Sequence, residues 1–266
     1  MRLLGMLTDA EVASFMRDGF VVVRGAVPRS VADACVDVVW AELEGRGIRR
    51  ADAGSWKTPV ERIGCPEDGG NGGPFAEAGT ADVLWEAYDL LIGPGKWWKR
   101  HGMGGTIPVR FPHPADPGDA GWHIEASYWD GTDWRANIRS RERGLLSLFL
   151  LTDVGPDDAP TRIRVGSHAD AARVLAPAGD GGLTMAESGP PIVEASADRR
   201  VIEATGSAGD VYLCHPFLVH AASWPHRGIS PRIITQPGVA LLEPFTLTDP
   251  AAAHPVEAAI LAAISG

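Results

Sequence analysis

The second half of the chain contains a succession of short strand-like segments that are separated by turns. Turn clusters such as Pro114–Gly118 and Gly155–Pro160 lie between them. Because no helix of crossover length separates most of these segments, the pattern favours an antiparallel sandwich or jelly roll, mainly β with flanking helices, over a doubly wound parallel sheet. The segments are 106–111, 122–128, 145–152, 161–165, 211–220 and 232–242.

Helices are expected on both sides of these strands. The first begins with a capping box, because Thr8 and Glu11 stand three residues apart before an apolar run. Ser30 is the expected cap of the second helix, and Thr80 starts the third. Residues 46–79 lose all periodicity and are expected to form a loop that covers a pocket. The chain is predicted to be one domain over residues 1–266, with a helical part at about 1–100, a jelly-roll core at about 104–245 and a C-terminal helix at about 249–264.

Composition excludes several classes of protein. The 24 basic and 34 acidic residues give a net charge of −10, which argues against nucleic acid or an anionic membrane as a partner. Three cysteines at unrelated spacings indicate a reducing compartment rather than a disulfide framework. The apolar stretch Leu3–Leu7 is too short for a secretory signal, and no segment is long enough to span a membrane. A cytoplasmic protein is expected.

A histidine and a carboxylate stand two residues apart in the segment Gly121–Tyr128. The tryptophan, isoleucine and tyrosine of this segment favour an extended strand, in which alternate side chains share a face. His123 and Glu125 would then point the same way, with their Cα atoms about 7 Å apart. This spacing allows both side chains to bind one metal ion.

A third ligand is expected from the segment 211–220. His215 and His220 are five residues apart, so on a regular strand they face opposite sides. His220 stands at the end of the element, where sites tend to be, and His215 is expected to be structural. Two histidines and one carboxylate on one face of a metal form the arrangement of non-haem Fe(II) oxygenases.

Two arginines are candidates for binding an anionic cosubstrate. The turn residues of 223–231 predict that the chain reverses and returns antiparallel to the strand it left, which brings Arg232 near His220. A guanidinium in such a cavity suits bidentate binding of a dicarboxylate; the alternative is a surface arginine paired with a carboxylate. Arg110 is a second cosubstrate contact, a substrate anchor, or a charge at a sheet edge.

Charged residues also crowd the segment 130–143, next to the proposed metal ligands. It is a mobile lid or, for most of its residues, a solvated loop. Several tryptophans line a pocket or fill the core: Trp56, Trp97, Trp98, Trp129 and Trp134.

Over nearly its whole length the chain resembles the phytanoyl-CoA dioxygenase family of Fe(II)- and 2-oxoglutarate-dependent oxygenases. The resemblance rests on a combination of stretches: Leu7–Glu11 with Phe15, Asp18–Phe20, Gly121–Glu125, Ala159–Arg162, Gly166–His168, Gly209–Val211, His220 and Arg232. It implies a cupin-like double-stranded β-helix in which His123, Glu125 and His220 hold Fe(II). It also implies that Arg232 binds the distal carboxylate of 2-oxoglutarate.

The chain departs from the family pattern at two places. The family usually has aspartate where this chain has Glu125, and Arg232 follows His220 by about one residue more than usual, so the turn between them is expected to be rebuilt. A carboxylate at position 125 favours oxygenation over halogenation.

The resemblance implies oxidation of a small-molecule metabolite by O₂, most simply hydroxylation, with release of succinate and CO₂. Specialised metabolism is the expected setting. Two alternatives stay open: a jelly-roll binding module that uses a metal structurally, and a zinc hydrolase, since three protein ligands and an open position also describe catalytic zinc. The absence of a protease general-base motif and the presence of Arg232 count against zinc.

Overall fold

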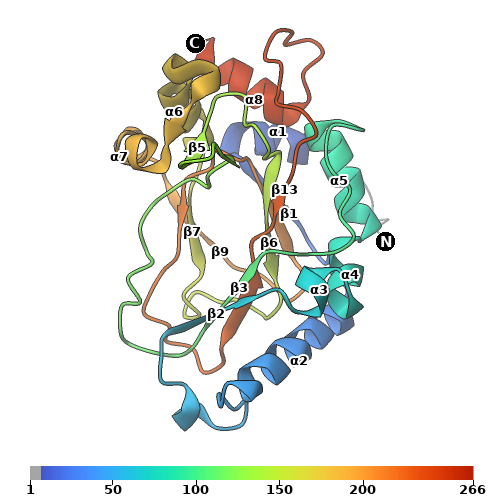
Figure 1. Ribbon diagram of the computed structural model, residues 1–266, viewed down its shortest axis with the longest axis vertical. Helices are drawn as coiled ribbons and strands as arrows, with labels where there is room; N and C mark the ends of the chain where they lie inside the picture. Colours follow the sequence, from blue (N-terminus) through green and yellow to red (C-terminus); the bar gives the residue numbers. More distant parts are fainter. Residues whose placement is uncertain (1–6, 266) are drawn as a thin grey trace.

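The computed structural model describes residues 7–265, so the stretch Leu3–Leu7, apart from its last residue, lies outside the described part of the chain. Antiparallel sheets form the centre of the molecule, with helices packed around them (Figure 1). The largest sheet has the order β1-β10-β6-β12-β3-β2, with β13 also paired to β6. Its strands are β1 (Phe20–Val23), β2 (Val60–Gly64), β3 (Thr106–Arg110), β6 (Leu145–Leu150), β10 (Val211–Cys214), β12 (Arg232–Thr235) and β13 (Gly238–Val239).

Two smaller sheets complete the β structure. One has the order β11-β7-β9, from His220–Ala221, Thr161–Arg164 and Val201–Ala204. The other has the order β4-β5-β8, from Tyr128–Trp129, Trp134–Ala136 and Leu183–Thr184. Every strand pair is antiparallel, which confirms the predicted mainly β class with flanking helices.

Strand β6 separates two hydrophobic layers. Its even-numbered leucines pack with Ile163 of β7 and Ile234 of β12 in a cluster between the large sheet and the β11-β7-β9 sheet. Its odd-numbered face, through Phe149, joins the core that the helices cover. Side chains alternate along a strand, so the two faces of β6 point into different layers. Both faces are covered, and all six residues of β6 are buried. The even-numbered face is the interior of the jelly roll.

Helices cover the outer face and the ends of the sheets. They are α1 (Asp9–Asp18), α2 (Arg29–Gly45), α3 (Pro66–Gly70), α4 (Gly73–Gly79), α5 (Asp82–Ile92), α6 (Ser167–Leu175), α7 (Met185–Ala195) and α8 (Pro255–Ile264), with short 3₁₀ turns at Ala53–Ser55 and Ala176–Gly181. The predicted capping box of α1 is confirmed. The prediction for Ser30 is wrong, because the cap position of α2 is two residues earlier, at Pro28, and has no side-chain cap. No helix within residues 7–265 combines the length and the apolar character needed to cross a bilayer.

Three other predictions need correction. Residues 46–79 are not one loop, since they contain β2, α3 and α4. The segment 211–220 is two strands in different sheets, because the chain turns at His215, whose carbonyl accepts a hydrogen bond from Leu218 N at 2.9 Å. Strand β12 pairs with β3 and β6 and not with the strand of His220.

The segment 122–128 is also not a regular strand. Before β4 it makes one isolated bridge, in which His123 and His220 exchange two backbone hydrogen bonds of 3.0 Å. This segment runs from one sheet to another. Of its residues before β4, only His123 pairs both its backbone N–H and its backbone carbonyl with another strand. The bridge alone sets the spacing of the two histidines.

Candidate active site

Three predicted ligands meet at the edge of the jelly-roll interior, where His220 is buried and the His123 side chain is 45% exposed. One Nε2 or carboxylate oxygen from each of His123, Glu125 and His220 lies within 4.8 Å of the other two. Oε1 of Glu125 is 3.7 Å from Nε2 of His123 and 3.5 Å from Nε2 of His220. The longer side chain of Glu125 therefore reaches both imidazoles from an irregular segment. One ion fits among the three groups.

The imidazoles are oriented for metal binding. Nδ1 of His123 lies 2.8 Å from the carbonyl of Gly121, and Nδ1 of His220 lies 3.0 Å from the carbonyl of Leu218. Since a carbonyl can only accept, each Nδ1 carries the proton and each Nε2 presents its lone pair to the centre. Nε2 of His220 is buried and has no hydrogen-bond partner within residues 7–265. This donor set fits Fe(II), which accepts imidazole and carboxylate ligands.

The facing groups also shift the protonation of Glu125 and His123. The imidazole of His123, and next that of His220, holds the pKa of Glu125 well below its usual range. Glu125 in turn raises the pKa of His123. In both cases the main cause is the facing of imidazole and carboxylate, which favours a proton on the imidazole; a metal ion held there would take the place of that proton at Nε2. The carboxylate is thus kept ionised, as a metal ligand must be.

Arginines of β7 hold the segment that carries His123. Arg162 donates from Nη2 to the carbonyls of Ala120 and Ala222, each at 3.0 Å. The guanidinium carbons of Arg162 and Arg164 lie 4.8 and 4.4 Å from the centre of the Trp122 ring. Cation–π contacts of this kind are worth roughly 0.5–2 kcal/mol each. They take the place of the strand pairing that this segment lacks.

Arg110 and Arg232 lie side by side, because they are register partners on β3 and β12. Both are 2% exposed, which excludes a surface position for Arg232 and a sheet-edge charge for Arg110. Arg232 donates to the carbonyl of Ala159 at 2.5 Å, and Arg110 donates to Asp119 at 2.8 Å. Nε and Nη1 of Arg110 and Nε of Arg232 have no hydrogen-bond partner within residues 7–265. Burial, and then the charge of Arg110, lowers the pKa of Arg232 to about 9.

A cavity of about 260 Å³ joins these arginines to the metal ligands, since Arg110, Arg232, His123 and His220 all line it. The strand period explains this arrangement: on β12, Arg232 and Ile234 face the interior while Ile233 joins the outer core. Within residues 7–265 these two buried cations form one ion pair, that of Arg110 with Asp119, which also pairs with the half-exposed Arg62; Asp158 acts on Arg232 from a longer distance. An anion fits this cavity.

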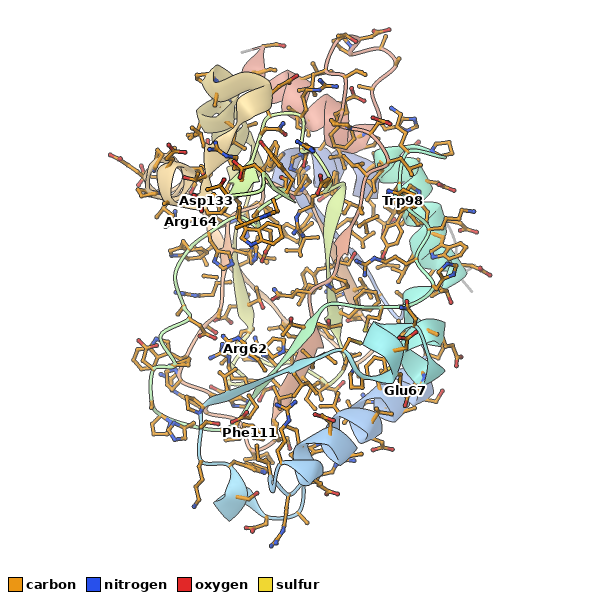
Figure 2. All side chains as sticks on the ribbon, in the orientation of Figure 1. Arg62, Glu67, Trp98, Phe111, Asp133 and Arg164 are labelled. Atoms are coloured by element: carbon orange, nitrogen blue, oxygen red, sulfur yellow. The ribbon has the colours of Figure 1, made fainter. Side chains whose placement is uncertain are left out.

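A second cavity, of about 620 Å³, opens on the other side of the metal ligands. Both His123 and Glu125 line it, together with Asp133, Trp134 and Arg143. Figure 2 shows Arg62, which lines the small cavity, and Asp133, which lines the large one, at different heights along the longest axis of the molecule. The ligand cluster therefore stands between two separate cavities.

Other predicted features lie elsewhere or have another role. His215 is structural, with Nε2 3.2 Å from the carbonyl of Val256 and Nδ1 accepting from Phe217 N at 3.1 Å. The turn before Arg232 is held by backbone donors of Arg227 and Gly228 to the carbonyl of Asp157. The segment 130–143 is not a simple loop, because it contains β5 and ends at the half-buried Arg143.

Sequence reasoning missed Asp119 and did not separate Arg143 from its charged neighbours. Asp119 follows a proline- and glycine-rich turn and has no periodic pattern around it, so nothing local marks it as buried. For Arg143 the only signal was its position directly before the apolar strand 145–150.

Residues 100–233, half of the chain, match the family model described as phytanoyl-CoA dioxygenase. Among the curated proteins, none matches the sequence significantly. Solved structures with the same fold include the non-heme alpha ketoglutarate dependent carbocyclase SnoK from nogalamycin biosynthesis, at 17% identity over 88% of this chain and 84% of that one, with a TM-score of 0.58.

Two further structures share this fold. HygX from Streptomyces hygroscopicus, with nickel, 2-oxoglutarate and hygromycin B bound, is 16% identical over 88% of this chain and 87% of that one, with a TM-score of 0.53. EctD from S. alaskensis, with 2-oxoglutarate and 5-hydroxyectoine, is 16% identical over 91% and 78%, with a TM-score of 0.54. The predicted jelly roll is confirmed by these likenesses.

Proposed function

Because the chain belongs to the phytanoyl-CoA dioxygenase family, we propose that it is an Fe(II)- and 2-oxoglutarate-dependent oxygenase that oxidises a small molecule, most simply by hydroxylation. The observation that carries the proposal is the facing of two Nε2 lone pairs and one carboxylate beside two buried arginines with free donors. In this proposal the whole of residues 1–266 forms one catalytic domain.

His123, Glu125 and His220 would hold the iron, and Arg232 and Arg110 would bind the distal carboxylate of 2-oxoglutarate. The chemistry supplied at this centre is activation of O₂ with 2-oxoglutarate as electron donor, so that succinate, CO₂ and an oxygenated substrate leave.

The protein's own residues prepare the site. The carbonyls of Gly121 and Leu218 fix the imidazole tautomers, which keeps both Nε2 atoms free of protons. Arg232, buried and already held by Ala159, offers its Nε without rearrangement. Ile234 gives the small cavity an apolar wall beside its charged side chains.

The same proposal places the enzyme in the cytoplasm, acting on a diffusible metabolite and on neither nucleic acid nor membrane. Specialised metabolism is supported by two of the similar structures, one from nogalamycin biosynthesis and one with hygromycin B bound.

Anaerobic addition of Fe(II) and 2-oxoglutarate tests the proposal. A visible metal-to-ligand charge-transfer band is expected in the wild type and in His101→Ala, which removes an exposed imidazole far from the site in sequence. His220→Ala is expected to lose the band while keeping its far-UV circular dichroism. On admission of O₂, succinate release distinguishes an oxygenase from a binding module or a zinc hydrolase. Folded wild-type protein without the band would contradict the proposal.

A further inference from the structure

The large cavity is lined by one arginine that has no ion-pair partner among the described residues 7–265. Arg143 lines it together with His123 and Glu125. Its Nε donates to the carbonyl of Ala126 at 2.8 Å, the residue after the predicted metal ligand. Among residues 7–265, no carboxylate lies within ion-pair distance of Arg143 and its two terminal nitrogens make no hydrogen bond with the protein. The guanidinium lies between the wall of this cavity and Gly238, since a Cβ added to Gly238 would be 2.5 Å from Nη1.

The turn that carries Arg143 is built to hold it in this position. Arg143 N donates to the carbonyl of Ser140 at 3.0 Å, and the Ser140 hydroxyl donates back to the carbonyl of Arg143 at 2.6 Å. Ser140 and Glu142 both have positive φ, of 46° and 67°. A backbone conformation that L residues rarely adopt, used twice in three residues, requires support from these bonds. The guanidinium is therefore positioned before any ligand arrives.

Charge around Arg143 favours an anion. Its main electrostatic partner in the chain is Glu125, which the proposed function commits to the metal. A cation held partly out of water without an ion-pair partner is unfavourable, and an anionic ligand offsets that cost. Asp133 is the other carboxylate of the cavity wall, but it is exposed and water screens it.

We infer that the substrate carries a carboxylate or a phosphate that binds Arg143, and that its apolar body lies against Trp134 and Met185. This inference rests on the proposed function, since it assigns the large cavity to the substrate. Arg143 does not line the small cavity that holds Arg110 and Arg232, so its ligand is a different molecule from 2-oxoglutarate. The anionic group binds next to Glu125, and the oxidised carbon lies close to it in the substrate.

Gly238 provides a way to move Arg143 without removing its charge. A Cβ on this β13 residue would lie 2.5 Å from Nη1 of Arg143, and nearly all its close contacts are with this flexible side chain. Gly238→Ala is therefore expected to displace the guanidinium and leave the fold intact. Arg141→Gln is the matched control, because it removes one exposed positive charge from the same turn.

The test measures binding of three fluorinated probes by ¹⁹F NMR to protein loaded with Ni(II) and saturating 2-oxoglutarate. The probes are 4-fluorobenzoate, 4-fluorophenyl phosphate and the neutral 4-fluorobenzamide. At least one anion is expected to bind the wild type and Arg141→Gln about 10-fold or more tightly than the amide. The tighter anion identifies the acidic group. Arg143→Gln is expected to lose the preference, and Gly238→Ala to reduce it. An absent preference in the wild type, or one that persists in Arg143→Gln, overturns the inference.

The affinity for 2-oxoglutarate separates this inference from the proposed function. Titration of the anaerobic Fe(II) charge-transfer band is expected to give the same 2-oxoglutarate Kd in wild type and Arg143→Gln. A weakened Kd in the variant would assign Arg143 to the cosubstrate and overturn the inference. If the wild type lacks the band, the proposed function fails. The probes are then compared in the double variant Arg110→Gln/Arg232→Gln, in which the small cavity has lost its pair of cations. A preference for anions that disappears when Arg143→Gln is added supports an anion site at Arg143. Absence of such a preference overturns the inference.

Discussion

Arg232 and Arg110 differ in how their charges are matched, although they are neighbours across two strands. Arg110 forms an ion pair of 2.8 Å with Asp119, whereas Arg232 forms no ion pair within residues 7–265 and donates only to a carbonyl. An added carboxylate therefore gains more from Arg232. Burial of the pair without a complete set of counter-charges is a cost that the ligand offsets.

Arg232→Gln is expected to raise the Kd for 2-oxoglutarate by about 100-fold, since loss of a buried charge-assisted hydrogen bond typically costs 2–3 kcal/mol or more. Arg110→Gln is expected to raise it by about 10-fold, because Asp119 already neutralises part of that charge. Titration of the anaerobic charge-transfer band measures both. Arg227→Gln, an exposed arginine in the preceding turn, is the control. Equal Kd values in Arg232→Gln and Arg227→Gln would contradict this assignment.

At the level of elements, the entry into β10 depends on close backbone packing. Gly209 has φ +94°, its carbonyl accepts from Val27 N at 3.0 Å, and a Cβ added to it would lie 2.1 Å from the carbonyl oxygen of Val27. Neither backbone can yield without breaking that hydrogen bond. Gly25 also has positive φ, +59°, but nothing lies within 4 Å of its added Cβ.

Gly209→Ala is expected to lower the free energy of unfolding by about 3 kcal/mol or more, the sum of a left-handed backbone and a clash. Gly25→Ala carries only the backbone part and is expected to cost about 1 kcal/mol. Urea denaturation of the two variants separates the cost of the left-handed backbone from the cost of the clash. Equal losses would show that the contact with Val27 is relieved.

Local patterns predicted elements whose partners are close in sequence or whose burial is complete. The capping box of Thr8 is of this kind and is confirmed, and the predicted strand 145–152 is found as the wholly buried β6, which ends at Leu150. The pairing of β12 with β3 and β6 was not predictable, because jelly-roll strands pair with partners far away along the chain. The irregular path of 122–128 was missed because arginines on β7, rather than a neighbouring strand, hold Trp122.

The same distinction applies to the candidate site. Its residue types and spacings pointed to His123, Glu125, His220 and Arg232 before any coordinates, since metal and carboxylate chemistry limits the choice of side chains. Asp119 and the separate environment of Arg143 depend on tertiary packing alone. No sequence pattern shows which of several arginines in a charged segment becomes buried when the chain folds.

On the scale of the whole molecule, the buried pair His168 and His215 links the helices α1, α6 and α8. His168 of α6 lies 3.2 Å from the carbonyl of Met16 in α1, and its ring centre is 4.9 Å from that of His215, which contacts α8 through Val256. Burial lowers the pKa of His168 to about 4 and that of His215 well below its usual value. Both rings are neutral in the folded protein near pH 7.

Acid is therefore expected to destabilise the fold. Between pH 6.5 and about 4 the unfolded chain binds a proton at His168 that the folded protein does not, so the free energy of unfolding falls as pH falls through this window. The contribution of His168 is at most about 3 kcal/mol. His168→Gln is expected to flatten the pH dependence of urea midpoints across this range, whereas His101→Gln, at an exposed position, is expected to leave it unchanged. Identical slopes in His168→Gln and wild type would contradict this account.

His123 lines both cavities. This has a consequence for how family members with new substrates arise. The small cavity draws its remaining walls from β2, β3, β7, β11, β12 and the residues next to them, including Asp119. The large one is lined by residues 124–126 before β4, by Asp133 and Trp134, by Arg143 and by the start of α7. The paired arginines and the part of the large cavity formed by Trp134, Arg143 and the start of α7 thus lie on different segments of the chain, although Glu125 belongs to both the metal cluster and the large cavity. The β4–β5 hairpin and the turn at Arg143 are the units to exchange between relatives when a catalyst for a different molecule is sought.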